Sequence, residues 1–172
     1  GVELFSFVTT ASRGFWERAV WKGPDRFDFS RFDDEVRRFL AMAPDALLLP
    51  RLEMSVPDWW RRTYPEDLVQ VRGAEGAPQP LLLPPADSRT LRKNPDIRRR
   101  TVPSWASRRW REDTADAIRR LIEHAQQSDY ADRIVGWHIC SGESHEWFQW
   151  NNAVDVSPAN LAAWRRWLRN KY

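Results

Sequence analysis

The chain has few of the residues that mark several common classes of protein. Its 172 residues include a single cysteine, Cys140, so no internal disulfide can form and the redox compartment stays open. The apolar runs, such as those at 46–49 and 81–83, are far shorter than the roughly 20 residues that cross a bilayer. The amino terminus shows no charged segment, apolar segment and cleavage site in succession. We therefore expect a soluble protein of the bacterial cytoplasm with no membrane partner.

Lysine is also scarce. Among 27 basic residues only three are lysines, and 24 acidic residues leave a net charge of +3. An excess of arginine can reflect a GC-rich genome as easily as selection for phosphate binding. Basic and aromatic residues interleave over 98–111, a pattern that suits single-stranded nucleic acid, but acidic residues share the region. The sequence therefore predicts no nucleic-acid partner, with nucleic-acid binding kept as a minor alternative.

Tryptophan, in contrast, is abundant, with 11 residues. Large flat rings beside carboxylates are what a sugar site uses to stack the apolar faces of pyranose rings. Helical spacing around Trp110, Trp164 and Trp167 predicts core or half-buried positions for these three. A second group lies in expected loops after strands, where ligand contact and packing are equally open: Trp59, Trp60, Trp147 and Trp150.

Apolar periodicity predicts an alternation of strands and helices. Strands are expected at 2–9, 46–52 and 134–139, and helices at 30–42, 108–127 and 157–172. Ser30 and Ser157 are expected to cap the first and last helix, with Pro158 at the first helical position. Pro50 weakens the second strand because proline cannot donate to a ladder. The alternation favours an α/β fold of βα units around a parallel sheet.

One long segment breaks this alternation. Residues 64–103 are rich in Pro, Gly and Arg and show no sustained period. Loops of this length inside compact domains are usually functional or mobile. We expect a loop excursion on the active-site side of a single domain that covers residues 1–172.

The third expected strand runs directly into a loop rich in chemically active side chains. Glu143 and Glu146 lie there with His145 and Trp147. Parallel-barrel enzymes place their chemistry just past the carboxyl ends of the strands, so these carboxylates are the first candidates for catalysis. The alternative is a solvated acidic loop. A catalytic pair formed by the two glutamates is disfavoured, because such a pair must flank the sugar from opposite sides.

Three further residues lie at expected strand ends. Arg51 and Glu53 are candidates for substrate contact, with an internal ion pair as the alternative. His138 could hydrogen-bond a sugar hydroxyl or be a satisfied structural histidine. His138, Cys140 and His145 could also form a zinc site with a nearby glutamate, but the spacing is a weak signal. We expect neither metal nor cofactor.

Three ordered segments resemble glycoside hydrolase family 42, the β-galactosidase-type enzymes of clan A. Residues 56–68 (VPDWWRRTYPEDL) are similar to the family's Pro-x-Trp-Leu…Tyr-Pro-Glu-x-Leu segment after its third strand. Residues 134–138 (IVGWH) resemble its fourth strand, Val-Ile-Ala-Trp-Gln. Residues 157–158 with 164–172 (SP, WRRWLRNKY) look like its Phe-Arg-x-Trp-Leu-x-x-x-Tyr helix.

The resemblance implies a (β/α)₈ TIM-barrel type of fold, of which this chain holds roughly strands 2 to 4. It also implies retaining hydrolysis of a β-glycoside, which needs two carboxyl groups about 5 to 5.5 Å apart. The family's Asp-Asn-Glu ending of the fourth strand is replaced by Cys140-Ser141-Gly142. The acid/base is therefore expected at Glu146, with Glu143 the runner-up. The family carries its nucleophile on the seventh strand, beyond this chain.

A complete barrel takes roughly 250 residues, so we expect the 172-residue chain to be inactive by itself. A non-catalytic carbohydrate-binding fragment of a barrel is the alternative function. Under either interpretation the expected partner is a carbohydrate. A second copy of the chain or the remainder of a longer chain could complete the protein.

Overall fold

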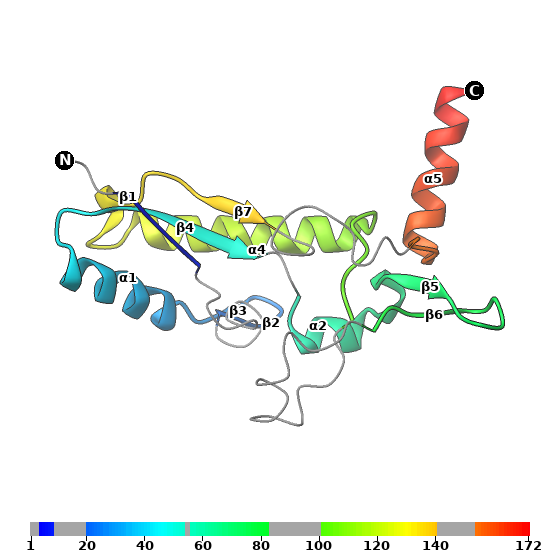
Figure 1. The fold of residues 1–172 in the computed structure, drawn as a ribbon, viewed down its shortest axis with the longest axis horizontal. Coiled ribbons are helices and arrows are strands. Elements are labelled where there is room, and N and C mark those ends of the chain that lie inside the picture. The colour runs from blue at the N-terminus through cyan, green and yellow to red at the C-terminus, as the bar shows by residue number, and fades with distance from the viewer. Residues whose placement is uncertain (1–3, 9–19, 54–55, 83–100, 141–153) are drawn as a thin grey trace. The chain divides into compact units, whose positions relative to one another are not determined.

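The structure, a computed structural model, describes residues 4–8, 20–53, 56–82, 101–140 and 154–172, with 4–8 and Glu53 described by their backbone alone (Figure 1). The chain divides into two compact units. The first comprises Gly1–Trp60 and Asp113–Phe148, and the second comprises Arg61–Glu112 and Gln149–Tyr172. Each unit is described below by itself.

The first unit contains a parallel sheet of three strands. These are β1 (Leu4–Val8), β4 (Leu47–Glu53) and β7 (His138–Cys140), in the order β1-β4-β7. Both strand pairs are parallel, and they align Val8 with Arg51 and Arg51 with His138 (blue, cyan and yellow in Figure 1). The predicted parallel βα arrangement of the three strands is therefore confirmed. Spatial order follows chain order, with no reversal.

Two helices of the first unit lie side by side. Helix α1 (Ser30–Met42) connects β1 to β4, and α4 (Arg108–Gln126) connects β4 to β7. His124 of α4 contacts Asp33 of α1, with the imidazole Nε2 2.7 Å from a carboxylate oxygen. When strand order follows chain order, right-handed crossovers place successive helices on the same face of the sheet. This is the winding of a barrel rather than of a doubly wound sheet, but the described strands form an open sheet and not a closed barrel.

The core of the first unit lies between β4 and these helices. Alternate residues of β4, including Leu48 and Leu52, are buried, whereas their neighbours are half-buried, so one face of the strand packs against the helices. Burying a side chain of this size stabilises the fold by about 1.5–3 kcal/mol. The helices contribute the predicted apolar stripes, whose buried members are Phe32, Val36, Thr114, Ala117, Leu121 and Ala125.

Helix caps follow the prediction at one end of the chain and differ at the other. Ser157 caps α5 (Pro158–Lys171) by accepting a hydrogen bond from the Asn160 backbone, as predicted. Ser30 does not cap α1. It is the first helical residue, and its backbone N–H and hydroxyl both donate to the Asp28 carboxylate, at 3.1 and 2.6 Å. The Asp28 carboxylate therefore accepts from Ser30 itself, and the Ser30 hydroxyl donates to that carboxylate instead of accepting from the first turn of the helix.

The third strand is shorter than predicted because its pairing with β4 is interrupted. Ile134 forms an isolated parallel bridge with Leu48, and regular pairing resumes with His138 opposite Arg51. Two residues of β4, at 49–50, therefore lie opposite three residues, at 135–137. Pro50 has no N–H, so the break costs the ladder no bond from that residue. A Cβ on Gly136 would lie 3.1 Å from Leu49 Cδ1, which favours glycine at the break.

Sequence periodicity missed two short elements in the first unit. One is the hairpin of β2 (Trp21–Gly23) and β3 (Arg26–Phe27), which turns at Asp25 with a φ of 51°. The Gly-Pro-Asp run at the turn is a local signal that could have indicated it. The other is α2 (Asp58–Thr63), which begins in this unit and holds two tryptophans that were expected in a loop. A 3₁₀ turn, η3 (Ala131–Arg133), precedes the third strand.

The second unit gives structure to part of the predicted excursion. It contains the 3₁₀ turn η2 (Pro65–Asp67) and the antiparallel hairpin of β5 (Gln70–Arg72) and β6 (Pro78–Pro80). Gly76, with a φ of 80°, lies in the hairpin turn, a backbone conformation that glycine adopts without strain. Within the expected excursion over 64–103, the described residues 65–80 thus form a turn and a hairpin, which sequence periodicity missed because such local elements need no long apolar period; the excursion as a whole stays a prediction.

The second unit holds three tryptophans for which core or half-buried positions were predicted. Trp110, in α4, is 5% exposed, which confirms its predicted core position. Helix α5 also belongs to this unit, and its apolar stripe is less buried than predicted. Trp164 and Trp167 stack on each other at 4.9 Å but are 53% and 47% exposed. Among the described residues, no helix combines the length and apolar content needed to cross a membrane.

Candidate functional site

Two of the predicted site residues meet at the carboxyl ends of the strands. Arg51 of β4 and His138 of β7 are aligned as partners in the parallel ladder, so their side chains leave the same face of the sheet. Leu48 and Leu52 of β4 are buried toward the helices. Because side chains alternate along a strand, Arg51 and His138 belong to the opposite face, which we call the open face.

His138 differs from a structural histidine in its contacts. It is exposed, and its imidazole forms no hydrogen bond or ion pair with the part of the chain that the structure describes. Arg51 beside it is half-buried. An exposed imidazole beside a guanidinium offers hydrogen-bond donors and one acceptor to a polar ligand. The exposed imidazole is compatible with ligand binding, and the ligand-binding interpretation of His138 stays a prediction.

Two positions further along the same two strands, on the same face, Glu53 is aligned with Cys140. Cys140 is fully buried, and its thiol donates to the Leu52 carbonyl oxygen at 3.4 Å. The zinc alternative needs Cys140, His138 and His145 together, but His145 lies outside the described residues. Within the described residues, no three His, Cys, Asp or Glu side chains gather closely enough to hold a metal. The ion pair between Arg51 and Glu53 is untested because the Glu53 side chain is not described.

The catalytic candidates lie outside the described residues. Residues 141–153 follow Cys140 in the chain and include Glu143, Glu146, Trp147 and Trp150. They stay sequence predictions. The structure describes the end of the strand that precedes them, together with the neighbouring residues of the two other strands.

The tryptophans after the second strand have structural contacts. Trp60 is fully buried, and its indole N–H donates to Asp113 of α4 at 2.7 Å. Trp59 is half-buried, packs edge-on against Trp21 at 5.4 Å and donates its N–H to the Trp21 carbonyl at 3.3 Å. Trp60 thus has no exposed ring face for a sugar, and its helix rather than a loop explains why. Trp59 keeps part of its surface, so its predicted ligand contact stays open.

Residues 64–67, which are part of the segment 56–68 that resembles the family, make contacts that stabilise the second unit. The Arg109 guanidinium lies 4.2 Å from the centre of the Tyr64 ring and 2.9 Å from carboxylate oxygens of both Glu66 and Asp67. A backbone hydrogen bond, together with Arg109, holds the pKa of Glu66 below its ordinary value. The Tyr-Pro-Glu-Asp-Leu run is therefore explained by packing around one arginine, without a catalytic role.

Arginines of the proposed nucleic-acid stripe have carboxylate partners. Arg108 lies 2.6 Å from Glu112, besides the contacts of Arg109 just described. Beyond that stripe, Arg119 and Arg120 of the same helix both contact Asp116, at 3.0 and 2.7 Å. Such pairs reduce the positive charge available to a phosphate backbone. The absence of a nucleic-acid partner stays a prediction.

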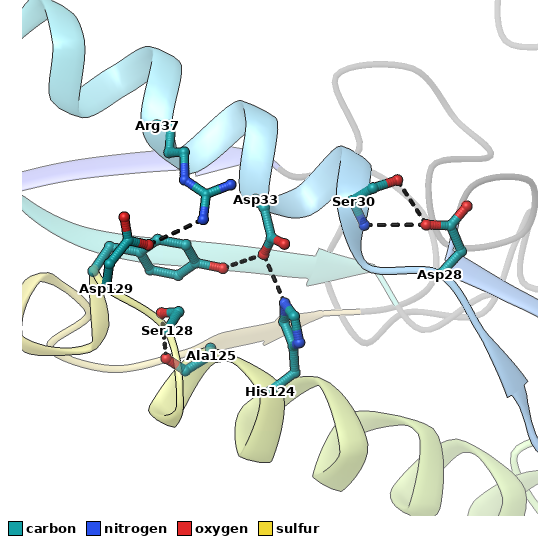
Figure 2. Close-up of polar contacts among 9 residues, drawn as sticks. Asp28, Ser30, Asp33, Arg37, His124, Ala125, Ser128 and Asp129 are labelled. Atoms are coloured by element: carbon teal, nitrogen blue, oxygen red, sulfur yellow. Dashed lines mark hydrogen bonds and ion pairs between the residues drawn. The ribbon is translucent and has the colours of Figure 1, made fainter.

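A separate polar cluster links α1 to α4, and sequence analysis missed it (Figure 2). One oxygen of Asp33 accepts from the Tyr130 hydroxyl and lies 2.7 Å from His124 Nε2. Tyr130 is 2% exposed, and burial together with its bond to Asp33 raises its pKa well above the ordinary value. The His124 ring stacks on Phe29 at 4.6 Å. More than 90 residues separate Asp33 from its two partners, so no local pattern could reveal the cluster.

A second ion pair lies beside this cluster. Arg37 contacts Asp129 at 3.0 Å and lies 5.7 Å from the centre of the Tyr130 ring. We call Asp33, Arg37, His124, Asp129 and Tyr130 the interhelix cluster. Its groups bond to one another across the two helices and the turn after α4, so it holds the helices together and needs no ligand to complete it.

Comparisons with known proteins give a likeness in fold. No protein-family model matches the chain, and no curated protein matches its sequence. Among solved structures, a crystal structure of a cold-adapted β-galactosidase from Rahnella sp. R3 matches with a TM-score of 0.61 and 16% sequence identity. The match covers 99% of this chain and 20% of that chain. The chain thus has the fold of a portion of that protein and spans about a fifth of its length.

Proposed function

We propose that the chain is part of a retaining glycoside hydrolase of the β-galactosidase type, with the sequence features of family 42. The observation that carries the proposal is the alignment of Arg51 and His138 on the open face, at the carboxyl ends of parallel strands. In parallel barrels this edge is where substrates bind. The fold likeness to part of a β-galactosidase supports the same class.

The proposed roles follow from the chemistry of each side chain. Glu146 donates the proton to the leaving oxygen, and Glu143 is the alternative donor. Trp147 provides apolar surface beside the carboxyl, which disfavours the charged form and suits an acid catalyst. Arg51 and His138 bond sugar hydroxyls. The remaining proposed contacts to the sugar are made by Glu53, Trp59 and Trp150.

Non-catalytic carbohydrate binding is the second candidate, and one observation favours it. The described sheet has three strands, which supply one wall of a sugar site. A retaining mechanism needs a second carboxylate on the other side of the sugar. A site on one side of the sugar is enough for weak binding, but it cannot catalyse hydrolysis of the glycosidic bond by that mechanism.

The purified 172-residue chain tests the proposal directly. We expect it to bind a non-hydrolysable thio-β-galactoside, with changes in the imidazole NMR signals of His138 but not of His124. We expect no robust hydrolysis of an aryl β-galactoside. His138→Ala should weaken binding, and His124→Gln serves as the matched control.

Two outcomes would contradict the proposal. The absence of any sugar binding at millimolar concentrations would remove its carbohydrate basis. Hydrolysis by the chain alone, lost in Glu146→Gln or Glu143→Gln, would show that the catalytic machinery is complete and that the division of the site is wrong.

A further inference from the structure

On β4, the open face of the sheet is apolar until it reaches Arg51. Leu47 and Leu49 precede Arg51 on this face, and all three residues are half-buried. At Arg51, the register aligns Val8, Arg51 and His138 across the three strands. None of these three aligned positions holds an aspartate or a glutamate. The sheet therefore presents one cation and one imidazole beside apolar residues.

These surroundings strengthen the attraction between Arg51 and an anion. Coulomb energy increases as the effective dielectric constant falls, so a half-buried charge attracts an opposite charge more strongly than a charge in bulk water does. The planar guanidinium binds a carboxylate or phosphate through two parallel N–H bonds. Arg51 also interacts within the protein, but a guanidinium has five N–H donors and one carboxylate occupies two of them. Arg51 can therefore hold the anionic group of a ligand as well.

His138 supplies a second donor beside Arg51. The two residues are aligned on neighbouring strands, which lie about 4.8 Å apart in a sheet, so both can reach one group of a ligand. An imidazole has at least one N–H in either protonation state. A sugar hydroxyl both donates and accepts, whereas a carboxylate or phosphate only accepts, which suits a guanidinium that only donates. The pair therefore fits an anionic group better than a hydroxyl.

We propose that the candidate sugar site selects glycosides whose sugar carries a negative charge, with Arg51 binding the anionic group and His138 donating a further hydrogen bond. This inference rests on the function proposed above, and it narrows the substrate class from neutral to acidic sugars. In this assignment Arg51 and His138 determine specificity, and neither takes part in bond cleavage.

Relative affinities measured on the intact chain test the proposal. The probes are thio-β-galactosides that differ only at C6, where they carry a hydroxyl, a carboxylate or a phosphate. We expect an anionic probe to bind about 10-fold or more tightly than the neutral one, as for hydrogen bonds that involve charged groups. The tighter of the two anionic probes identifies the anion. Equal binding of all three probes, or tightest binding of the neutral one, would overturn the proposal.

Substitutions distinguish recognition of the charge from damage to the fold, because damage lowers all three affinities together and leaves their ratio unchanged. Arg51→Gln should bring the anionic and neutral affinities close together, and His138→Gln should reduce the preference by a smaller factor. Arg37→Gln, at an arginine of the interhelix cluster, is the matched control and should leave the preference unchanged. A preference that persists in Arg51→Gln would overturn the proposal.

A second substitution covers the case in which Arg51→Gln does not fold. Arg51→Lys keeps the charge without the planar fork, so it should reduce the preference in part. A preference that is unchanged in both Arg51→Lys and His138→Gln would contradict the assignment.

Glu53 provides the strongest competing explanation. It follows Arg51 by two positions on β4 and so belongs to the same face, where a carboxylate could neutralise the guanidinium. In that case the wild type would show no preference and Glu53→Gln would create one, which would overturn the proposal. Binding of the neutral probe without any preference for an anion contradicts this inference alone. Binding of none of the three probes by the wild type would instead contradict the proposed function.

Discussion

Two polar regions of the first unit differ in how their groups are satisfied. In the interhelix cluster, Asp33 bonds Tyr130 and His124 within the protein. At the strand ends, His138 is exposed and its imidazole forms no hydrogen bond with the described part of the chain. Buried polar groups are costly unless paired, so the cluster contributes to the fold when its bonds are complete. A polar group left exposed at the edge where parallel-barrel enzymes bind substrates contributes little to stability and stays available to a ligand.

The comparison gives opposite expectations for substitutions in the two regions. Changes at the strand ends should lower ligand binding or catalysis with little loss of stability. Changes among the satisfied groups should lower the free energy of unfolding and leave ligand recognition intact. Each substitution below tests one side of this contrast, from the largest expected effect to the smallest.

The largest expected effect is on catalysis by a complete barrel that contains this chain. Glu146→Gln should slow hydrolysis of substrates with poor leaving groups by about 10²–10⁴-fold, the usual contribution of a general acid. Activated aryl galactosides need little protonation and should lose less at the glycosylation step. Added azide should restore turnover by replacing the lost base. Steady-state rates on both substrate types, with Glu143→Gln in parallel, make the measurement.

Equal losses on both substrate types without azide rescue would remove Glu146 from the acid/base role. Full activity of Glu146→Gln beside an inactive Glu143→Gln would transfer the role to Glu143.

Trp60→Ala should give the largest loss of stability. Its ring is fully buried and its N–H bonds Asp113, so truncation should cost about 3–5 kcal/mol. Trp59→Ala, at a half-buried ring, should cost less. Urea unfolding followed by far-UV circular dichroism measures both. A loss for Trp60→Ala below that for Trp59→Ala would contradict the core assignment.

Asp33→Ala should cost about 1–3 kcal/mol, because it leaves the buried Tyr130 hydroxyl without its acceptor. Tyr130→Phe removes the other partner and should cost less. Combined in a double-mutant cycle, the two losses should fall short of their sum, as for groups in one hydrogen-bond network. Strict additivity would show that Asp33 and Tyr130 do not interact. Sugar binding should be unchanged in both variants.

The raised pKa of Tyr130 gives the cluster a dependence on alkaline pH. A raised folded-state pKa favours the neutral phenol in the folded chain, so this stabilisation is complete below the ordinary tyrosine pKa of about 10. It is lost as the pH rises from there toward the folded-state value. In an absorbance titration, the wild type should show a tyrosine step well above the ordinary pKa, and Tyr130→Phe should remove that late step. A late step that persists in Tyr130→Phe, or its absence from the wild type, would contradict the assigned environment.

His138→Ala should have the smallest effect on stability, within about 0.5 kcal/mol, as for surface positions without special contacts. The same variant should weaken thiogalactoside binding. Thermal unfolding and binding titrations on one preparation distinguish the two effects. A stability loss as large as that of Asp33→Ala, with unchanged binding, would reverse the contrast between the two regions.

Local patterns predicted the local structure well. The strand and helix alternation predicted the parallel sheet, and helical spacing predicted the buried stripes that include Val36 and Leu121. The cap at Ser157 followed from its proline neighbour. The strands, the helical stripes and the cap depend on residues close together in the chain, so a single sequence contains the information that they need, and the parallel pairing followed from their alternation.

Contacts between distant segments could not be predicted in the same way. Asp33 and Tyr130, or Ser104 and Asp155, meet only after the chain has folded, and no spacing relates them. Trp60 carried the composition signal of a sugar platform but is fully buried. A tryptophan after a strand has the same local signature whether it packs inside or faces a ligand, so sequence alone could not separate the two.

The interruption beside Pro50 has a consequence for which side chains share the open face. Side chains alternate with a period of two, so one extra residue inverts the phase of everything that follows it. Continued without a break, the alignment of Ile134 with Leu48 would set His138 opposite Leu52, toward the helices. The additional residue at 135–137 instead sets His138 opposite Arg51 and lets Trp137 stack on Phe32 of α1. Pairing that continued through the break would therefore exchange an imidazole for an indole on the open face, whereas deleting Gly136 would close the break and leave His138 opposite Arg51.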